Sequence, residues 1–222
     1  MKRIDHAVIL AAGRGLRLMP LTSTVPKPMA KLWGNTLLEL GVSNLRQYVR
    51  KIHVTVGYKG AILADHAISI GVDSIINTSE KGNAWWISNS LLSNYDSPVL
   101  VNTCDNIAKI NFKLLEEEYF SLGAPACMLV PVPPVEGFDG DFIVHDNNYI
   151  LQLSRNSPTN LYCSGIQVLN PARITAKYSG INDFGELWSE MIVGRELMCS
   201  NIMPLTWIAV DTLEQLSRLN GA

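Results

Sequence analysis

Long apolar runs, an excess of charge of either sign and paired cysteines are all missing from this sequence of 222 residues. No apolar segment approaches the roughly 20 residues that a membrane-spanning helix requires, so we expect no such helix. Lysine and arginine total 18 against 20 aspartate and glutamate residues, which gives a net charge of −2. This balance argues against nucleic acid or an anionic membrane as a partner, because both attract basic patches.

Cysteine is scarce and scattered: the four residues are Cys104, Cys127, Cys163 and Cys199, with no CxxC pair among them. This spacing favours reduced thiols over a disulfide framework or a cysteine metal site. The first apolar run begins at Ala7, which is too early for a signal peptide. Both observations predict a cytoplasmic protein.

The remaining composition, 47% hydrophobic and 17% charged, predicts one globular domain over residues 1–222. Short β-branched segments alternate with segments of helical apolar spacing. The expected strands are 7–10, 52–56, 74–77, 98–102, 125–132 and 161–169, and the expected helices are 37–48, 61–70, 80–91, 112–122, 183–192 and 213–219. Such alternation predicts an α/β fold with parallel βαβ units, in which ligands bind at the carboxyl ends of the strands.

The most informative segment covers residues 7–29, with the sequence AVILAAGRGLRLMPLTSTVPKPM. An apolar run of the kind seen in buried strands ends in small residues, whose backbone N–H groups can approach a ligand closely. Arg17 and Lys27 follow this loop, and both can offset charge on phosphorus oxygens. The segment therefore predicts a polyphosphate site.

Two common nucleotide motifs do not fit the same segment. No Gly-Lys-Ser/Thr follows the glycines, which excludes a P-loop. Arg17 stands where the third glycine of a dinucleotide-binding loop belongs, which disfavours an NAD-dependent oxidoreductase.

Residues 10–22 and 26–28, LAAGRGLRLMPLT and PKP, closely resemble the signature of the nucleotidyltransferases that make nucleoside-diphosphate sugars and alcohols. This resemblance implies a Rossmann-like (GT-A-type) fold with a mixed, mostly parallel sheet flanked by helices. It also implies that Lys27 and Arg17 are catalytic. The nucleotide-binding residues it implies are Leu10, Ala11, Ala12, Gly13, Arg14, Gly15, Gly82 and Asn83.

Two aspartates are candidate ligands for Mg²⁺. Asp105 follows a predicted core strand, where a carboxylate can bind a divalent cation beside a phosphate. Asp211 lies in a stretch, residues 206–212, that resembles the segment carrying the second metal aspartate of the same family. A helix N-cap is the alternative role for Asp211.

The sequence gives several candidate residues for binding the acceptor substrate and does not single out one acceptor. Asn83 and two tryptophans replace the family's usual Gly-Thr-Ala-Gly, and this departure resembles the bacterial phosphocholine cytidylyltransferases. Candidate acceptor-binding residues are Trp85, Trp86, Tyr162, Phe184, Trp188 and Asp183, with Trp207 as a further aromatic. Aromatic faces attract quaternary ammonium groups, although most of these rings could instead belong to the core. A hairpin or lid around residues 133–160 is expected to cover the acceptor.

The predicted reaction is Mg²⁺-dependent transfer of a nucleoside monophosphate, CMP by preference, from a nucleoside triphosphate to a small phosphorylated alcohol or amine such as phosphocholine. Uridylyl or thymidylyl transfer to a sugar 1-phosphate is the first alternative, and a nucleotide-binding subunit without catalysis is the second. The base, the acceptor and a homo-oligomeric state stay open.

Overall fold

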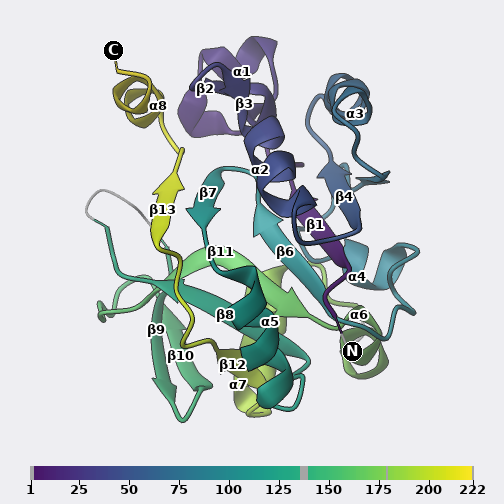
Figure 1. Ribbon diagram of the computed structural model, residues 1–222, viewed down its shortest axis with the longest axis vertical. Coiled ribbons are helices and arrows are strands. Elements are labelled where there is room, and N and C mark those ends of the chain that lie inside the picture. Colours follow the sequence, from purple (N-terminus) through teal and green to yellow (C-terminus); the bar gives the residue numbers. More distant parts are fainter. Residues whose placement is uncertain (1–2, 136–139, 179, 222) are drawn as a thin grey trace.

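The computed structural model describes residues 3–135, 140–178 and 180–221, and it is built around one central sheet (Figure 1). The strands of this sheet are β1 His6–Leu10, β4 Lys51–Val56, β5 Ser74–Asn77, β6 Val99–Thr103, β8 Cys127–Val132, β9 Phe142–Asp146, β10 Tyr149–Ser154, β11 Tyr162–Leu169 and β12 Leu197–Cys199. Two small ribbons pair β2 Lys31–Leu32 with β3 Asn35–Thr36, and β7 Asn106–Lys109 with β13 Thr206–Ala209.

The helices are α1 Leu21–Thr24, α2 Leu37–Arg46, α3 Gly60–Ser69, α4 Trp86–Asn89, α5 Phe112–Ser121, α6 Pro171–Lys177, α7 Phe184–Val193 and α8 Leu213–Leu219, with 3-10 turns η1 Leu16–Leu18 and η2 Lys27–Met29. Local sequence determines where several of them begin. The Thr36 hydroxyl accepts from the backbone of Glu39, whose carboxylate accepts in turn from the backbone of Thr36. Thr212 and Gln215 form the same reciprocal box at the start of α8.

The nine strands run in the order β5-β4-β1-β6-β11-β8-β12-β10-β9. The first four are parallel, with α2, α3 and α4 in the connections between them. Antiparallel pairs gather in the second half, around β11 and the β9–β10 hairpin. The prediction of a mixed sheet flanked by helices is therefore confirmed.

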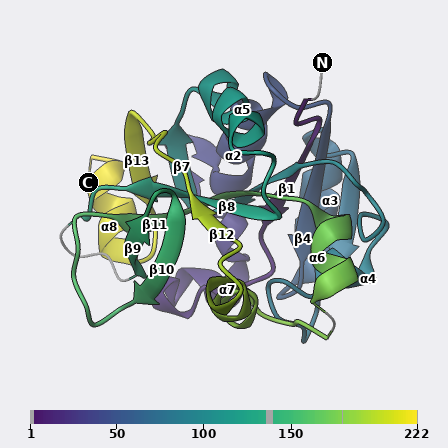
Figure 2. The ribbon, with the colours of Figure 1, turned by 90° about the horizontal axis from the view of Figure 1, so that it is seen from below.

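Two cores lie on opposite faces of the sheet, as Figure 2 shows for the helices. Ala7 and Ile9 of β1 pack in one core with α2, α3 and α5, while Val8 between them packs in the other with α4, α6 and α7. This alternation follows from the two-residue period of a strand. A third, smaller core joins Leu18 and Leu32 to Val210 and Leu216, so α8 packs against the signature segment.

One predicted helix is wrong and one predicted hairpin is confirmed. Residues 80–91 do not form a continuous helix: Glu80 has a left-handed backbone (φ 61°), and only Trp86–Asn89 is helical. The hairpin turns at Asn147 and Asn148, both with positive φ, as a tight two-residue turn requires. It extends the central sheet through β12 and does not stand apart from it. Residues 136–139 of the predicted lid lie outside the described residues.

No helix within the described ranges has both the length and the apolar character needed to cross a bilayer.

Candidate active site

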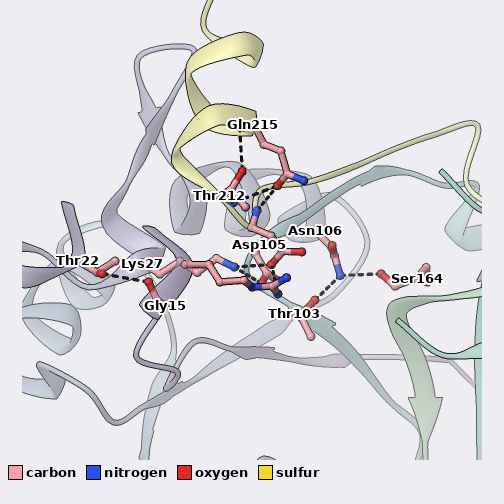
Figure 3. A network of polar contacts seen from close by, with 11 residues as sticks. Gly15, Thr22, Lys27, Thr103, Asp105, Asn106, Ser164, Thr212 and Gln215 are labelled. Atoms are coloured by element: carbon pink, nitrogen blue, oxygen red, sulfur yellow. Dashed lines mark hydrogen bonds and ion pairs between the residues drawn. The ribbon is translucent and has the colours of Figure 1, made fainter. Parts of the chain in front are cut away.

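Lys27 lies at the centre of a cluster of four charged side chains, and Figure 3 shows it pointing toward Asp105. Its ammonium Nζ donates to Asp105 Oδ2 at 2.6 Å and to Asp211 Oδ1 at 3.0 Å, and Arg17 Nη2 is also 3.0 Å from Asp211 Oδ1. Burial acts to lower the pKa of Lys27, but the carboxylates of Asp105 and Asp211 outweigh it and hold that pKa above its usual value. Lys27 therefore remains a cation at neutral pH.

A two-stranded ribbon brings the two aspartates together, although they are far apart in sequence. Asp105 lies in the turn between β6 and β7, and Asp211 directly follows Val210 at the end of β13. β7 and β13 pair in antiparallel register, and the backbone N–H of Val210 donates to the carbonyl of Asp105 at 3.0 Å. Backbone hydrogen bonds thus fix the separation of the two carboxylates.

The turn that carries Asp105 is held by Asn106, whose side-chain amide donates to Thr103 Oγ1 at 2.5 Å and to the Ser164 carbonyl at 2.7 Å (Figure 3). Gly165 makes room for this amide: it has φ +80°, and a Cβ there would lie 2.2 Å from Asn106 Nδ2. The glycine therefore permits β11 to bulge against the turn.

The first turn of α8 holds the backbone of Asp211 in place. The side-chain carbonyl of Gln215 accepts from the backbone N–H of both Asp211, at 2.7 Å, and Thr212, at 3.1 Å. The N-cap of α8 is Thr212, so Asp211 does not have the alternative role of helix N-cap.

The signature loop places Lys27 through Gly15. Gly15 has φ +61°, and a Cβ there would lie 2.7 Å from the Cβ of Lys27. Its carbonyl accepts from the Thr22 hydroxyl at 3.0 Å. Only glycine combines this backbone conformation with such a close approach.

A cavity of about 660 Å³ lies against the first part of the signature loop, and the four charged residues are not among those that line it. The predicted nucleotide-binding residues that line it are Leu10, Ala12, Gly13, Arg14, Gly82 and Asn83. Thr55 within β4, Gly57 and Tyr58 after it, and residues 78–81 after β5 complete its walls. Ala11 is buried and donates from its backbone to Thr55 Oγ1 at 3.0 Å. The cavity therefore extends along the carboxyl ends of the parallel strands, where α/β proteins bind ligands.

A larger cavity, of about 1,100 Å³, lies at the opposite edge of the sheet, near Ile4 and Val49 at the amino ends of β1 and β4. It contains none of the predicted site residues. Size alone therefore does not identify the site in this protein.

The two carboxylates fit a divalent cation of the Mg²⁺ type. Both reach the same ammonium group, so one cation can contact both, and carboxylate oxygens are the donors that Mg²⁺ prefers. Within the described part of the chain, no group of three or more His, Cys, Asp or Glu side chains is arranged to hold a metal. Phosphate oxygens and water would have to complete the coordination.

The predicted acceptor residues do not form one group. Trp86 is fully buried and Phe184 is 3% exposed, so both belong to the core, which corrects their assignment to a ligand-facing cage. Phe184 stacks on Trp188, whose indole N–H donates to Gln167, and Asp183 caps α7 by accepting from Gly185. Trp85 is half-buried, with the Lys81 ammonium 5.8 Å from its ring centroid.

Tyr162 packs in a separate group with Phe142 and Trp207, with ring centroids 5.5 and 6.1 Å away. Trp207 Nε1 donates to the Ser164 carbonyl at 2.9 Å, the same oxygen that accepts from Asn106. Trp207 therefore lies next to the turn that carries Asp105, Tyr162 packs against Trp207, and Phe142 packs against Tyr162.

Asn106, Gln215 and Tyr58 also belong to the site, although no motif in the sequence marks them as parts of it. Tyr58 donates its hydroxyl to the Thr22 carbonyl at 2.9 Å, and its ring lies 5.6 Å from the Arg14 guanidinium. The box formed by Thr212 and Gln215 was readable from the sequence, but its contact with Asp211 depends on tertiary structure.

Sequence comparison finds known proteins that are similar to parts of this chain. The bifunctional protein GlmU of Methanococcus aeolicus is 43% identical over 60 residues, which cover 27% of this chain and 15% of that protein. Glucose-1-phosphate adenylyltransferase 2 of Vibrio parahaemolyticus is 29% identical over 180 residues, covering 69% of this chain and 44% of the relative. The chain thus spans less than half the length of these two relatives.

A crystal structure of a UDP-glucose pyrophosphorylase with UDP-glucose superposes with a TM-score of 0.77 at 16% identity, over 98% of this chain and 97% of that one. This likeness confirms the nucleotidyltransferase type of α/β fold. Residues 6–149 match the family described as nucleotidyl transferase, and they include Arg17, Lys27 and Asp105. The chain therefore belongs to the nucleotidyl transferase family.

Proposed function

We propose that this protein catalyses attack of a phosphate monoester oxygen on the α-phosphorus of a nucleoside triphosphate. A bond forms between that oxygen and the α-phosphorus, the α–β bridging bond breaks, and pyrophosphate leaves. The observation that carries the proposal is the contact of Lys27 with both Asp105 and Asp211 beside Arg17. The two cations suit anionic substrates, and the two carboxylates suit the divalent cation that would accompany a triphosphate.

The reaction needs alignment and charge neutralisation more than proton transfer. A phosphate monoester has its second pKa near 6, so the attacking oxygen is already an anion at neutral pH. Lys27 would bridge the α-phosphate and the acceptor phosphate, and Arg17 with the backbone of residues 13–15 would hold the outer phosphates. Asp105 and Asp211 would hold Mg²⁺, whose contribution when bound is to neutralise charge on the phosphate oxygens.

The strand order supports one orientation for the nucleotide. Asp105 follows β6, the signature loop follows β1, and the remaining cavity walls follow β4 and β5. These strands are neighbours in the order β6-β1-β4-β5. The phosphates would therefore lie over β6 and β1, and the nucleoside over β4 and β5.

For the acceptor, a sugar 1-phosphate becomes the first candidate. Trp86 and Phe184 are core residues, which removes two rings from a cage for an ammonium group, and the relative from Vibrio is named for glucose 1-phosphate. Phosphocholine with CTP is the second candidate, because Trp207 lies beside the Asp105 turn and packs in a row with Tyr162 and Phe142. We propose that the β9–β10 hairpin covers this side, and that the reaction takes place in the cytoplasm.

The test is a grid of pyrophosphate-release assays. CTP, UTP, dTTP, ATP and GTP with Mg²⁺ would each be paired with sugar 1-phosphates, phosphocholine and phosphoethanolamine. At least one pair should release pyrophosphate and yield the matching diphosphate product. Tight nucleotide binding without release for every pair would favour the non-catalytic alternative.

A further inference from the structure

The far wall of the 660 Å³ cavity is a loop that is not part of any regular element. Residues 78–83 line the cavity, between the end of β5 and the start of α4. Glu80 in this loop has a positive φ, a conformation that costs free energy in a residue other than glycine. The position of this wall must therefore be fixed by contacts with another part of the chain.

Those contacts come from the start of α7, about one hundred residues later in the sequence. Asn182 accepts twice, through Oδ1 from the Gly82 N–H at 2.9 Å and through its backbone carbonyl from the Ala84 N–H at 3.1 Å. In the opposite direction, Asn83 Oδ1 accepts from the Phe184 N–H at 2.8 Å. Each asparagine side chain thus binds the backbone of the other segment.

The approach of the two segments is very close. A Cβ on Gly82 would lie 2.1 Å from the Asn182 carbonyl oxygen, so no side chain fits at Gly82. α7 itself is anchored, because Phe184, Leu187 and Met191 are buried in the core below the sheet. The wall is therefore attached to a rigid helix and not only to the end of β5.

We propose that Asn182 is a positioning residue that selects the nucleotide base, acting through the loop at residues 78–83. Asn182 is not among the residues that line the cavity. By holding Gly82 it sets the distance between this wall and the nucleoside, and Asn83 supports it from the other side. The inference rests on the nucleotidyl transfer proposed above, which places the nucleoside over β4 and β5.

The experiment compares three variants with the wild type. Asn182→Ala removes the side-chain acceptor, Asn182→Asp keeps an acceptor oxygen at the same place, and Asn156→Ala changes an exposed asparagine after β10. For each, Kd values for the five nucleoside triphosphates with Mg²⁺ are measured by calorimetry, together with KM, kcat and the melting temperature. The base preferred by the wild type and the next best define a discrimination ratio.

For Asn182→Ala we expect the Kd and KM of the preferred triphosphate to rise about fivefold, the effect of losing roughly one hydrogen bond. The discrimination ratio should fall, while kcat stays within twofold because Lys27 and its partners are untouched. Asn182→Asp should restore the ratio, and Asn156→Ala should match the wild type.

An unchanged ratio in Asn182→Ala, or a fall in melting temperature and kcat that Asn182→Asp does not reverse, would overturn the inference. Failure of the proposed function has a different signature: the wild type itself would neither bind a triphosphate nor release pyrophosphate.

Discussion

At the scale of single residues, Lys27 holds together two carboxylates that would otherwise repel each other. Its side chain is only 11% exposed, and its stem packs against Gly15. The replacement Lys27→Met keeps the length of the stem but removes the charge.

We predict that Lys27→Met lowers turnover by at least 100-fold, because a cation aimed at developing phosphate charge typically contributes a few kcal/mol to transition-state stabilisation. Circular dichroism should show that the fold survives. The measurement is steady-state pyrophosphate release under saturating substrates. Turnover close to that of the wild type would refute the role assigned to Lys27.

The same variant should respond to metal in the absence of nucleotide. Without the ammonium group, Asp105 and Asp211 face each other, and a divalent cation can relieve their repulsion. We expect millimolar Mg²⁺ to raise the melting temperature of Lys27→Met by a few degrees, about 1 kcal/mol, and that of the wild type by less. Lys113→Met on the exposed side of α5 serves as the control. Equal shifts in all three proteins would contradict this expectation.

Gly15 offers a matched pair with Gly13. Gly15→Ala should lower the melting temperature by several degrees, because a methyl group meets the Cβ of Lys27 at 2.7 Å on a backbone with φ +61°. Gly13→Ala should leave it unchanged, since no atom lies within 4 Å of the added carbon. Thermal unfolding by calorimetry makes the comparison, and a similar loss in both variants would mean that the contact with Lys27 is not the cause.

At the scale of elements, two histidines and a serine form a row of contacts across the neighbouring strands β1, β4 and β5. His6 Nδ1 lies 2.9 Å from His53 Nε2, and His53 Nδ1 lies 2.5 Å from Ser74 Oγ. Burial, and then the neighbouring His6, lower the pKa of His53 from 6.5 to about 4, while Asp73 acts in the opposite direction. Burial also lowers the pKa of His6.

Acid should therefore weaken the fold through His53. The folded pKa lies below the unfolded one, so the unfolded chain binds more protons, and stability falls as the pH drops from 6.5 to about 4. We expect a loss of about 2 kcal/mol, less than the pKa difference alone gives, because the ring is partly exposed. Urea unfolding at pH 7 and at pH 4.5 measures this loss, and His53→Asn should show a smaller one. An equal loss in His53→Asn would assign the effect to other groups.

Elements were predictable where local sequence determines them. The helices predicted from residues 37 and 213 begin at those residues, where Thr36 and Thr212 cap them, and the predicted hairpin turns at Asn147 and Asn148. The structure of residues 80–91 could not be predicted in this way. Their apolar residues pack as isolated turns held by Asn182 instead of forming one helix face. The short strand β12 could not be predicted from local sequence, because it pairs with β8 and β10, which are distant in sequence.

At the scale of the whole molecule, segments from both ends of the chain meet in one place. The signature loop and α8 share a small core, and the β7–β13 ribbon connects that core to the central sheet (Figure 1). From the sequence, Lys27 and Asp105 were identified by motif and strand position. Their contact with Asp211 depends on the register of the ribbon, and the burial of Trp86 depends on packing against the sheet. Neither can be read from local spacing.

The most direct test of the account is pyrophosphate release by Asp105→Asn and Asp211→Asn, measured beside the wild type with the best substrate pair and saturating Mg²⁺. Each substitution keeps the shape of the side chain and removes one charge from the pair that contacts Lys27. We predict that both variants stay folded and that each loses at least 100-fold in turnover. Normal turnover in either folded variant would show that the two carboxylates do not act as one centre.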